Sequence, residues 1–318
     1  MYPKKLRRPF ARAFAAMFLV LTPCAIGLAQ TIDDGIMVPK NSLFGGTLYT
    51  HDAWDHYWEG ALNRTNGNLG TVSTQSVNYF ANFGAIKRLN VMGTVPFIWT
   101  NASQGVLHPQ RGFQDLTLGA KYRLLVVQTG SRGAIEILPA VSGSIPMTNY
   151  SPDFQPLSIG FAAKTIAPRL TANFQGFGGV YLNGTAAYVF RSIVTLDRPY
   201  YFTSDQLTLS NQVAMPNQFD YTVSAGYRGH NMMFIGSFAR QQTRGGGDIR
   251  RQDMPFVSNR MNFSKGGASA VVPIPFVKNL QGWFMYSNTF DGRNVGQSNT
   301  FTTGLMYMIH FTRKGITR

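Results

Sequence analysis

The chain has 318 residues, of which 13% are aromatic and 14% charged, with 33 glycines and a formal net charge of +15. Its single cysteine excludes a framework of disulfide bonds and a cysteine-ligated zinc site. No stretch beyond residue 29 approaches the roughly 18 consecutive apolar residues that a membrane-spanning helix requires. High aromatic content with few charges is nevertheless typical of a membrane β-barrel, in which only one face of each strand is apolar.

Residues 1–29 are predicted to be a secretory signal peptide. Five basic residues and no acidic one lie among the first twelve positions, an apolar run follows over residues 13–28, and small residues stand just before Gln30. This order is typical of a cleaved export signal, so we expect cleavage before Gln30. Cys24 lies inside the segment to be removed, and the proline before it does not suit lipidation. An uncleaved membrane anchor is the alternative interpretation.

Alternation of apolar and polar residues with period two recurs along the remaining chain, as β-strands require. For example, Phe219, Tyr221 and Val223 are separated by Asp220 and Thr222. The alternation predicts an all-β fold, a transmembrane antiparallel β-barrel of about twelve strands, with about ten to fourteen also compatible. The expected strands cover residues 42–51, 70–83, 88–100, 112–127, 132–146, 156–168, 178–192, 215–228, 230–243, 259–272, 280–290 and 299–311.

Connections after the odd-numbered strands are longer than most of those after the even-numbered strands. The exception is the connection between the sixth and seventh strands, around residues 168–179. Short and long connections alternate in outer-membrane barrels, where tight turns face the periplasm and long loops face outward. An even strand count places both termini in the periplasm. We therefore expect a short periplasmic N-terminal segment at 30–41, a barrel at 42–311 and a periplasmic tail at 312–318.

The final expected strand resembles the terminal recognition signal of outer-membrane barrels. That signal places a polar residue, a glycine and spaced hydrophobic or aromatic residues before a closing aromatic residue. Gly304, Tyr307, Ile309 and Phe311 occupy these places here, after Thr302. The resemblance implies that they belong to the barrel-closing strand and signal to the barrel-assembly machinery. The chain continues for seven residues beyond Phe311, whereas many such proteins end at the aromatic residue.

The stretch GFQDLTLGAKYRLL, residues 112–125, resembles a strand of the meta-pathway phenol-degradation family of outer-membrane proteins. That family is related to outer-membrane transporters of fatty acids and aromatic hydrocarbons. The resemblance implies passive uptake of small, often hydrophobic or aromatic molecules, with outer loops at the entrance and lumen side chains setting selectivity. Fatty-acid transporters carry a long N-terminal plug, but only about a dozen residues precede the first expected strand here. We therefore do not expect a full plug.

Four charged residues stand on the polar faces of expected strands and are predicted to face the lumen: Lys121, Arg123, Asp220 and Arg228. As functional groups, the cations would lower the barrier for anionic solutes. As structural groups, they would form hydrogen bonds with Asp115, Asp220 and neighbouring asparagines, which is the favoured interpretation. Arginines in the expected loop around residue 250 are candidates to bind lipopolysaccharide phosphates.

The densest polar cluster comprises His51, Asp52, Asp55, His56 and Glu59. If this segment were helical, four of the five side chains would share one face and could hold a divalent metal. We favour the other interpretation, an outer loop rim with solvated charges. Tryptophan and tyrosine residues within the segment suit the level of the lipid headgroups.

The sequence contains no recognisable motif for nucleophilic catalysis or phosphate binding, so we expect neither an enzyme nor a cofactor or catalytic metal. The expected function is an outer-membrane channel of a Gram-negative bacterium for passive uptake of small hydrophobic or aromatic molecules. The alternative is a closed structural or surface-binding barrel without transport. Expected partners are outer-membrane lipid, lipopolysaccharide, the barrel-assembly machinery and a small-molecule substrate, with no nucleic acid. No oligomeric state follows from the sequence.

Overall fold

The computed structural model describes residues 31–203, 206–229, 232–250 and 255–311. The predicted signal peptide with Cys24 and the predicted tail at 312–318 lie outside the described residues. None of the helices in the described ranges is long and apolar enough to cross a membrane.

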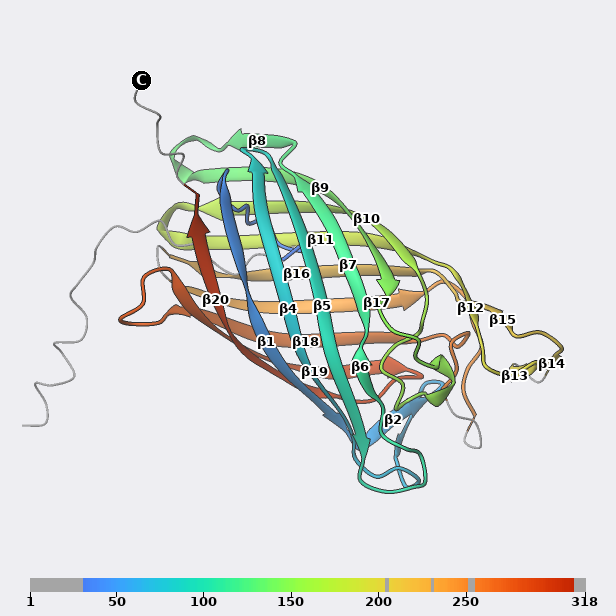
Figure 1. The fold of residues 1–318 in the computed structure, drawn as a ribbon. Helices are drawn as coiled ribbons and strands as arrows, with labels where there is room; N and C mark the ends of the chain where they lie inside the picture. The colour runs from blue at the N-terminus through green and yellow to red at the C-terminus, as the bar shows by residue number, and fades with distance from the viewer. Residues whose placement is uncertain (1–30, 204–205, 230–231, 251–254, 312–318) are drawn as a thin grey trace, which may run out of the picture.

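Twelve long strands form one closed antiparallel barrel (Figure 1), which confirms the predicted fold class. In chain order they are β1 (Ser42–Trp54), β4 (Val72–Ile86), β5 (Leu89–Ala102), β7 (Asp115–Tyr122), β9 (Gly133–Pro146), β10 (Thr165–Gly176), β11 (Val180–Arg191), β16 (Gln218–Arg228), β17 (Met233–Thr243), β18 (Asn262–Pro273), β19 (Leu280–Arg293) and β20 (Asn299–His310). The first strand, β1, pairs with both β4 and β20, which closes the ring. Closure pairs both edges of each long strand, as hydrocarbon surroundings require.

Shorter elements complete the wall and the connections. β6 (Arg111–Phe113) pairs with β5, and β8 (Leu125–Gln128) pairs with β9. The other short strands form three pairs: β2 (His56–Glu59) with β3 (Leu62–Thr65), β12 (Ile193–Thr195) with β15 (Gln212–Ala214), and β13 (Tyr201–Thr203) with β14 (Gln206–Thr208). Single 3₁₀ turns are η1 (Gly130–Arg132), η2 (Pro152–Phe154) and η3 (Phe177–Gly179).

Side chains alternate between the lumen and the outer face of the barrel, as the period-two pattern predicts. On β7, Leu118 is 58% exposed and Tyr122 38% exposed, whereas Lys121 is fully buried. On β20, Leu305 is exposed and the adjacent Met306 is fully buried. The outer face carries many exposed aromatic side chains, among them Tyr79, Phe83, Phe190, Tyr227, Phe234, Phe284, Tyr286, Phe290, Phe301 and Tyr307.

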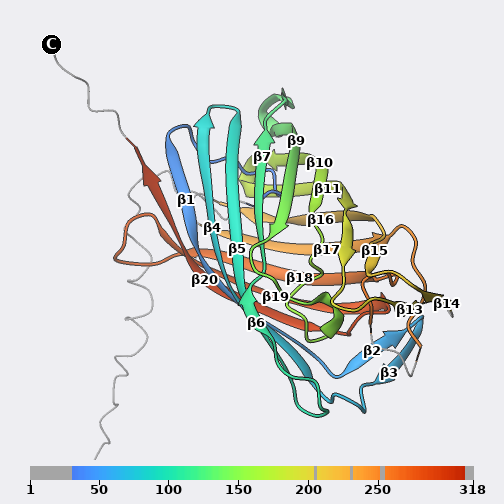
Figure 2. The ribbon, with the colours of Figure 1, turned by 45° about the vertical axis from the view of Figure 1, so that its right-hand side comes forward.

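The long connections gather at one end of the barrel, called here the loop end, and the tight turns lie at the other, called the turn end (Figure 1). Residues 147–164 join β9 to β10 and residues 192–217 join β11 to β16 at the loop end. Residues 87–88 join β4 to β5 and residues 177–179 join β10 to β11 at the turn end. Figure 2 shows β2, β3 and the β13–β14 pair together at the loop end.

The expected position of the sixth strand is wrong. The sequence pattern placed this strand at 156–168 and a connection at 168–179, but β10 covers Thr165–Gly176. The alternation is present in β10, with Ile166 and Leu170 exposed on the outer face and Thr171 and Asn173 buried in the lumen. Pro168 interrupts the pattern, because its missing N–H breaks the β10–β11 ladder at this point. With β10 in place, the connection to β11 is short.

Two prolines lie inside barrel strands, although proline is normally excluded from the middle of a sheet. Pro96 lies in β5 between Thr94, the last partner of β7, and Phe97, the first partner of β6. Pro139 lies in β9, where the neighbouring strand changes from β8 to β7. Each proline therefore occupies a break in one adjacent ladder, where its missing N–H costs little.

The seam between β1 and β20 closes the barrel in an unbroken register. Two glycines allow the strands to approach closely. A Cβ atom at Gly46 would strike the backbone carbonyl of Leu305, and one at Gly304 would strike the carbonyl of Thr47. Small residues at these two positions are therefore required for closure in this geometry.

The residues of the predicted closing signal take the expected faces. Tyr307, Ile309 and Phe311 are 42%, 41% and 54% exposed and point outward. β20 ends one residue before the expected end, but the Phe311 N–H still donates to the Asn41 carbonyl at 2.9 Å. Recognition of these residues by the assembly machinery stays a prediction.

Candidate functional site in the barrel lumen

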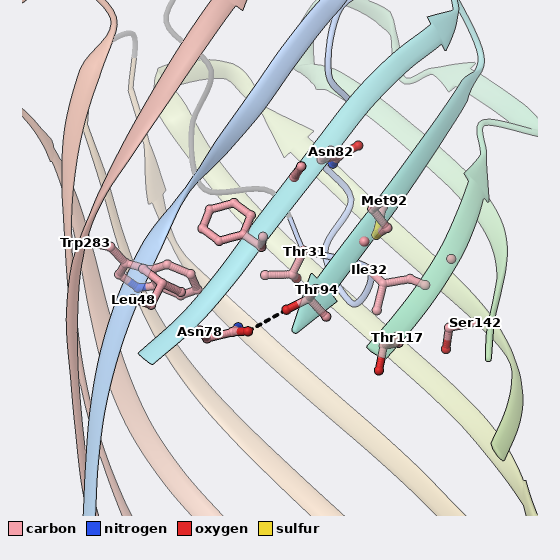
Figure 3. A pocket seen from close by; sticks show the side chains of 14 residues that line it. Thr31, Ile32, Leu48, Asn78, Asn82, Met92, Thr94, Thr117, Ser142 and Trp283 are labelled. Atoms are coloured by element: carbon pink, nitrogen blue, oxygen red, sulfur yellow. Dashed lines mark hydrogen bonds between the residues drawn. The ribbon is translucent and has the colours of Figure 1, made fainter. Parts of the chain in front are cut away.

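The chain segment before β1 lies inside the barrel. Residues 31–40 run through the turn-end half of the lumen, and Thr31 and Ile32 reach its middle, where they lie among inward side chains of the wall (Figure 3). The sequence predicted a periplasmic segment at 30–41, but residues 31–40 lie inside the barrel. They are too few for a separate domain, yet they act as a short internal plug.

A buried ammonium group holds the plug on β7. Lys121 Nζ donates to the carbonyl of Thr31 at 2.6 Å, to the carbonyl of Asp34 at 2.9 Å and to Asp34 Oδ1 at 3.0 Å. These three bonds use all three N–H donors of the ammonium group. A charge can be buried without a large penalty only when it is paired and fully hydrogen-bonded. Lys121 faces the lumen as predicted, but it binds the plug rather than lining an open path.

Asp33 holds the plug on β10 and β11. Its carboxylate forms an ion pair with Arg169. Its backbone carbonyl accepts from Asn183 Nδ2 at 3.0 Å and from Thr185 Oγ1 at 2.7 Å. The Tyr181 hydroxyl accepts a longer hydrogen bond, of 3.5 Å, from the backbone N–H of Gly35. Two neighbouring residues of the plug, Asp33 and Asp34, therefore bind it to three strands, β7, β10 and β11.

Apolar packing fixes the rest of the plug. Ile36 and Val38 are 1% and 2% exposed. They belong to a core that crosses the lumen, together with Phe44, Leu48, Tyr181, Met233, Ile235, Val271, Met306 and Met308. Because β1, which carries Phe44 and Leu48, lies opposite β11, which carries Tyr181, in the ring of twelve strands, this core joins opposite walls. Protein atoms therefore fill much of the turn-end half of the lumen.

The other predicted lumen charges also face inward, and each has a polar partner: Arg123 with Glu136 at 3.2 Å, Arg228 with Gln175 at 3.2 Å, and Asp220 with Gln218 at 2.6 Å. Asp115 is not one of these partners, since it accepts from the Tyr150 hydroxyl at 2.6 Å. The arrangement favours a structural role for these charges. Their influence on solute selectivity stays a prediction.

A cavity of about 250 Å³ lies in the middle of the lumen, beside the plug (Figure 3). Its described lining contains no charged side chain and consists of Thr31, Ile32, Leu48, Asn78, Phe80, Ala81, Asn82, Met92, Gly93, Thr94, Thr117, Gly119, Ser142 and Trp283. Thr94 Oγ1 donates to Asn78 Oδ1 at 2.6 Å across the cavity wall. The plug contributes Thr31 and Ile32, so the cavity is enclosed partly by the barrel and partly by the plug.

The predicted histidine and carboxylate cluster is divided between elements. His51 stands on the outer face of β1, while Asp52 points into the lumen and accepts from Thr300 Oγ1 at 2.6 Å. The same Thr300 hydroxyl accepts from Lys265 Nζ at 2.9 Å. Asp52 is therefore part of a polar lumen network near the loop end.

The remaining three residues of the cluster, Asp55, His56 and Glu59, lie at the β2–β3 hairpin rather than on a helix. The side chain of His56 hydrogen-bonds to Asp55 at 2.9 Å, which holds the pKa of this exposed carboxyl below its ordinary value. Glu59 forms an ion pair with Arg64 at 2.6 Å. Within the described ranges, no group of three or more His, Cys, Asp or Glu side chains is placed to hold a metal ion.

The long loops pack against one another at the loop end. One apolar cluster joins the three longest loops and contains Ala163, Val194, Leu196, Val213, Met215, Phe256 and Val257. A second joins Leu157 to Leu69 and Val72, and the Leu157 carbonyl accepts from Thr100 Oγ1 at 2.6 Å. The loop end is thus an ordered surface rather than a set of separate loops.

Neither the plug nor the cavity residues Phe80, Asn82 and Trp283 were predicted from the sequence. One signal was available for the plug. Asp33 and Asp34 are adjacent acids in a chain with 14 acidic and 29 basic residues, and apolar residues follow them directly. Adjacent acids before an apolar stretch suit a segment that pairs with lumen cations and then packs on an apolar wall. The sequence carries no comparable signal for Trp283, because the register of β19 decides whether its side chain points into the lumen or outward.

A solved outer-membrane channel shares this fold. The COG4313 outer membrane channel from Pseudomonas putida F1 aligns with a TM-score of 0.68 at 12% identity, over 89% of this chain and 100% of that chain. The NanC porin aligns with a TM-score of 0.45 at 7% identity, over 82% of this chain and 98% of that one. The CymD monoaromatic hydrocarbon channel aligns with a TM-score of 0.39 at 10% identity, over 87% and 90%.

The first of these likenesses defines the class of fold, a closed β-barrel of the outer-membrane type. No family profile matches the sequence, and no curated protein matches it. The resemblance to the meta-pathway phenol-degradation family is therefore not confirmed.

Proposed function

We propose that this chain is an outer-membrane channel of a Gram-negative bacterium that conducts small, uncharged hydrophobic or aromatic molecules by passive diffusion. The observation that carries the proposal is the mid-lumen cavity of about 250 Å³, which lies inside a closed barrel and has no charged side chain in its described lining. The many exposed aromatic side chains of the outer face suit lipid surroundings. In this arrangement the long loops face outward and the tight turns face the periplasm.

The plug would set the width of the path in this proposal. Ile36 and Val38 fill part of the turn-end half, so a solute must pass beside the plug or displace it. Displacement breaks the contacts of Asp33 and Asp34 with the wall but breaks no pairing between barrel strands. The barrel can therefore persist while the path widens.

Lipid and lipopolysaccharide are proposed partners of the outer surface. The outward faces of the strands would contact lipid chains, and cations at the loop end would contact lipopolysaccharide phosphates. Arg244 is one such cation, and its guanidinium group lies 5.4 Å from the centre of the Phe219 ring. Removal of this cation alone is expected to leave the barrel intact.

Uptake by intact cells tests the channel. Gram-negative cells depleted of their general porins would express the full chain, and the initial uptake of radiolabelled benzyl alcohol would be measured. Met92→Trp fills the cavity from the inner face of β5, while Val91→Trp places the same ring on the outer face, where Val91 is 46% exposed. We expect the wild type and Val91→Trp to accelerate uptake and Met92→Trp to lose the acceleration. Wild-type uptake no faster than in cells without the chain would contradict the proposal.

A closed structural barrel is the second candidate, and one observation favours it. The apolar core around Ile36 and Val38 joins opposite walls of the lumen, as expected of a permanently closed barrel. Removal of residues 31–39 separates the two functions. A structural barrel would show no uptake in its native form and would conduct only after this deletion.

A further inference from the structure

We infer that the turn end of the barrel, around its closing seam, binds the headgroups of anionic phospholipids such as phosphatidylglycerol. The site is a basic arc of four exposed side chains: Lys40, Lys87, Arg88 and Lys278. The inference goes beyond transport, since it assigns a class of lipid to one part of the surface. It rests on the proposed membrane orientation, in which the turn end meets the periplasmic leaflet.

The four cations belong to connections that neighbour one another around the barrel. Lys278 lies in the turn between β18 and β19, and Lys40 lies shortly before β1. Lys87 and Arg88 form the turn between β4 and β5. In the ring, β19 is followed by β20, β1, β4 and β5, and Figure 2 shows the turn-end ends of the last four strands side by side. With about 4.8 Å between neighbouring strands, the basic arc spans roughly 20 Å.

The cations stand directly beyond the apolar outer surface of the barrel. Ile86, the last residue of β4, is 51% exposed, and the two cations of the β4–β5 turn follow it. Phe83 and Phe311 lie edge to face with 6.4 Å between their ring centres, and both are exposed. Lys40 precedes Asn41, whose carbonyl accepts from the Phe311 N–H at 2.9 Å. Basic groups at the edge of a lipid-facing surface reach the level of the headgroups.

The charge of the basic arc is not neutralised within the described chain. None of its four side chains forms an ion pair with a described residue. Two described acids of the turn-end half, Asp34 and Glu136, are already paired with Lys121 and Arg123 inside the barrel. Ammonium and guanidinium groups both bind phosphate oxygens. The arc therefore offers an unoccupied set of cations to a phosphate group that carries a net negative charge.

An apolar tip beside Lys278 favours a lipid over a soluble anion. Phe276 is fully exposed and Val277 is 47% exposed. The backbone of Phe276 has a φ of 76°, in the left-handed region that is costly for an aromatic residue. The turn nevertheless keeps this ring off the barrel, and it projects from the wall in both views (Figure 1, Figure 2). Exposed apolar rings beside cations are typical of membrane interfaces, where the ring contacts acyl chains and the cation contacts phosphate.

Fluorescence quenching in phosphatidylcholine vesicles tests the inference with the purified full chain. Ile309→Cys places a bimane label at the turn end of β20, and Phe301→Cys places it on the same face towards the loop end. Phe83→Cys is a second turn-end reporter, and heat-modifiable gel mobility reports whether each variant is folded. Each label is exposed to brominated phosphatidylglycerol or brominated phosphatidylcholine at the same mole fraction.

Two sets of substitutions are compared in each reporter chain. The first changes all four residues of the basic arc to glutamine. The second is the matched control, which changes four exposed loop-end cations to glutamine: Arg111, Lys164, Arg244 and Arg250.

At the turn-end reporters we expect phosphatidylglycerol to be enriched about fivefold over phosphatidylcholine, the effect of roughly one basic side chain at an anionic surface. The enrichment should disappear when the basic arc is neutralised, persist in the loop-end control and fall as salt is raised. Equal quenching by the two lipids at the turn-end reporters would overturn the inference. Equal enrichment at Phe301→Cys, or enrichment that survives in the folded arc variant, would also overturn it. Since this assay involves no transport, its failure leaves the uptake experiment unaffected, and failed uptake leaves a positive lipid result standing.

Discussion

Lys121 and Asp34 form an ion pair inside the barrel, with 3.0 Å between Nζ and Oδ1, and no part of the Lys121 side chain is exposed. The pair joins β7 to the segment that precedes the first strand. It therefore holds the plug in the lumen and contributes nothing to the pairing of the wall strands. The strength of this contact decides how firmly the plug is seated.

Asp34→Asn is expected to loosen the plug. Loss of the carboxylate leaves a buried ammonium group without its counter-charge, which costs about 3 kcal/mol, or about a hundredfold in the population of the seated plug. We expect longer and more frequent openings in single-channel recordings. The change Asp197→Asn, in an exposed loop residue, is the charge-matched control. Lys121→Met combined with Asp34→Leu should bring the openings part of the way back to wild type, because both charges are removed while the Thr31 and Asp34 carbonyls lose their donor; openings as frequent as in Asp34→Asn would contradict this account.

Gly304→Ala is expected to destabilise the barrel seam. Its new Cβ would strike the backbone of β1, and such overpacking costs about 1–3 kcal/mol. Gly184→Ala in β11 is the matched control, because a Cβ there meets nothing within 4 Å. Thermal unfolding followed by loss of the fast-migrating gel band would compare the two. Equal unfolding temperatures would show that the seam does not depend on this close approach.

Strand positions were predictable where the outer face is apolar and the inner face polar, because this contrast appears directly in the sequence. β16 is the clearest example, with Val223 and Tyr227 exposed on the outer face and Gln218 buried in the lumen. β10 was misplaced because Pro168 interrupts its pattern. The lumen site was not predictable, since it depends on the plug reaching residues such as Lys121 that lie about 90 positions away in the chain. A local pattern carries no information on such a contact.

The contact between Asp248 and Arg293 makes one loop sensitive to pH. Arg293 Nη2 donates to Asp248 Oδ2 at 2.6 Å, and this bond lowers the pKa of the Asp248 carboxyl. A lowered pKa means that the contact stabilises the loop above the ordinary value of about 3.9 and is lost as pH falls through the lowered value.

Hydrogen exchange at the Ile249 amide, which donates to Asn294 in the same loop contact, reports this effect. Exchange should be slower in the wild type than in Asp248→Asn at pH 7. The difference should disappear progressively below pH 4. If the exchange rates of wild type and Asp248→Asn differed as much well below pH 4 as at pH 7, the assignment would be contradicted.

The end of β20 is predicted to carry the assembly signal. Deletion of residues 311–318 removes Phe311 and its hydrogen bond to Asn41, whereas deletion of residues 312–318 leaves both in place. We expect the longer deletion to lower the yield of folded barrel in the outer membrane much more than the shorter one. Equal yields would show that Phe311 is not part of the signal.

Single-channel conductance with and without the plug tests the central claim most directly. The full chain and a chain lacking residues 31–39 would be recorded in planar bilayers at the same salt concentration, after gel mobility has shown that both are folded. We predict a small, interrupted conductance for the full chain and a larger, steadier one for the shortened chain, because the deletion removes Ile36, Val38 and the Asp33 and Asp34 contacts from the lumen. Equal conductance of the two chains would contradict the account of the N-terminal segment as the plug of this channel.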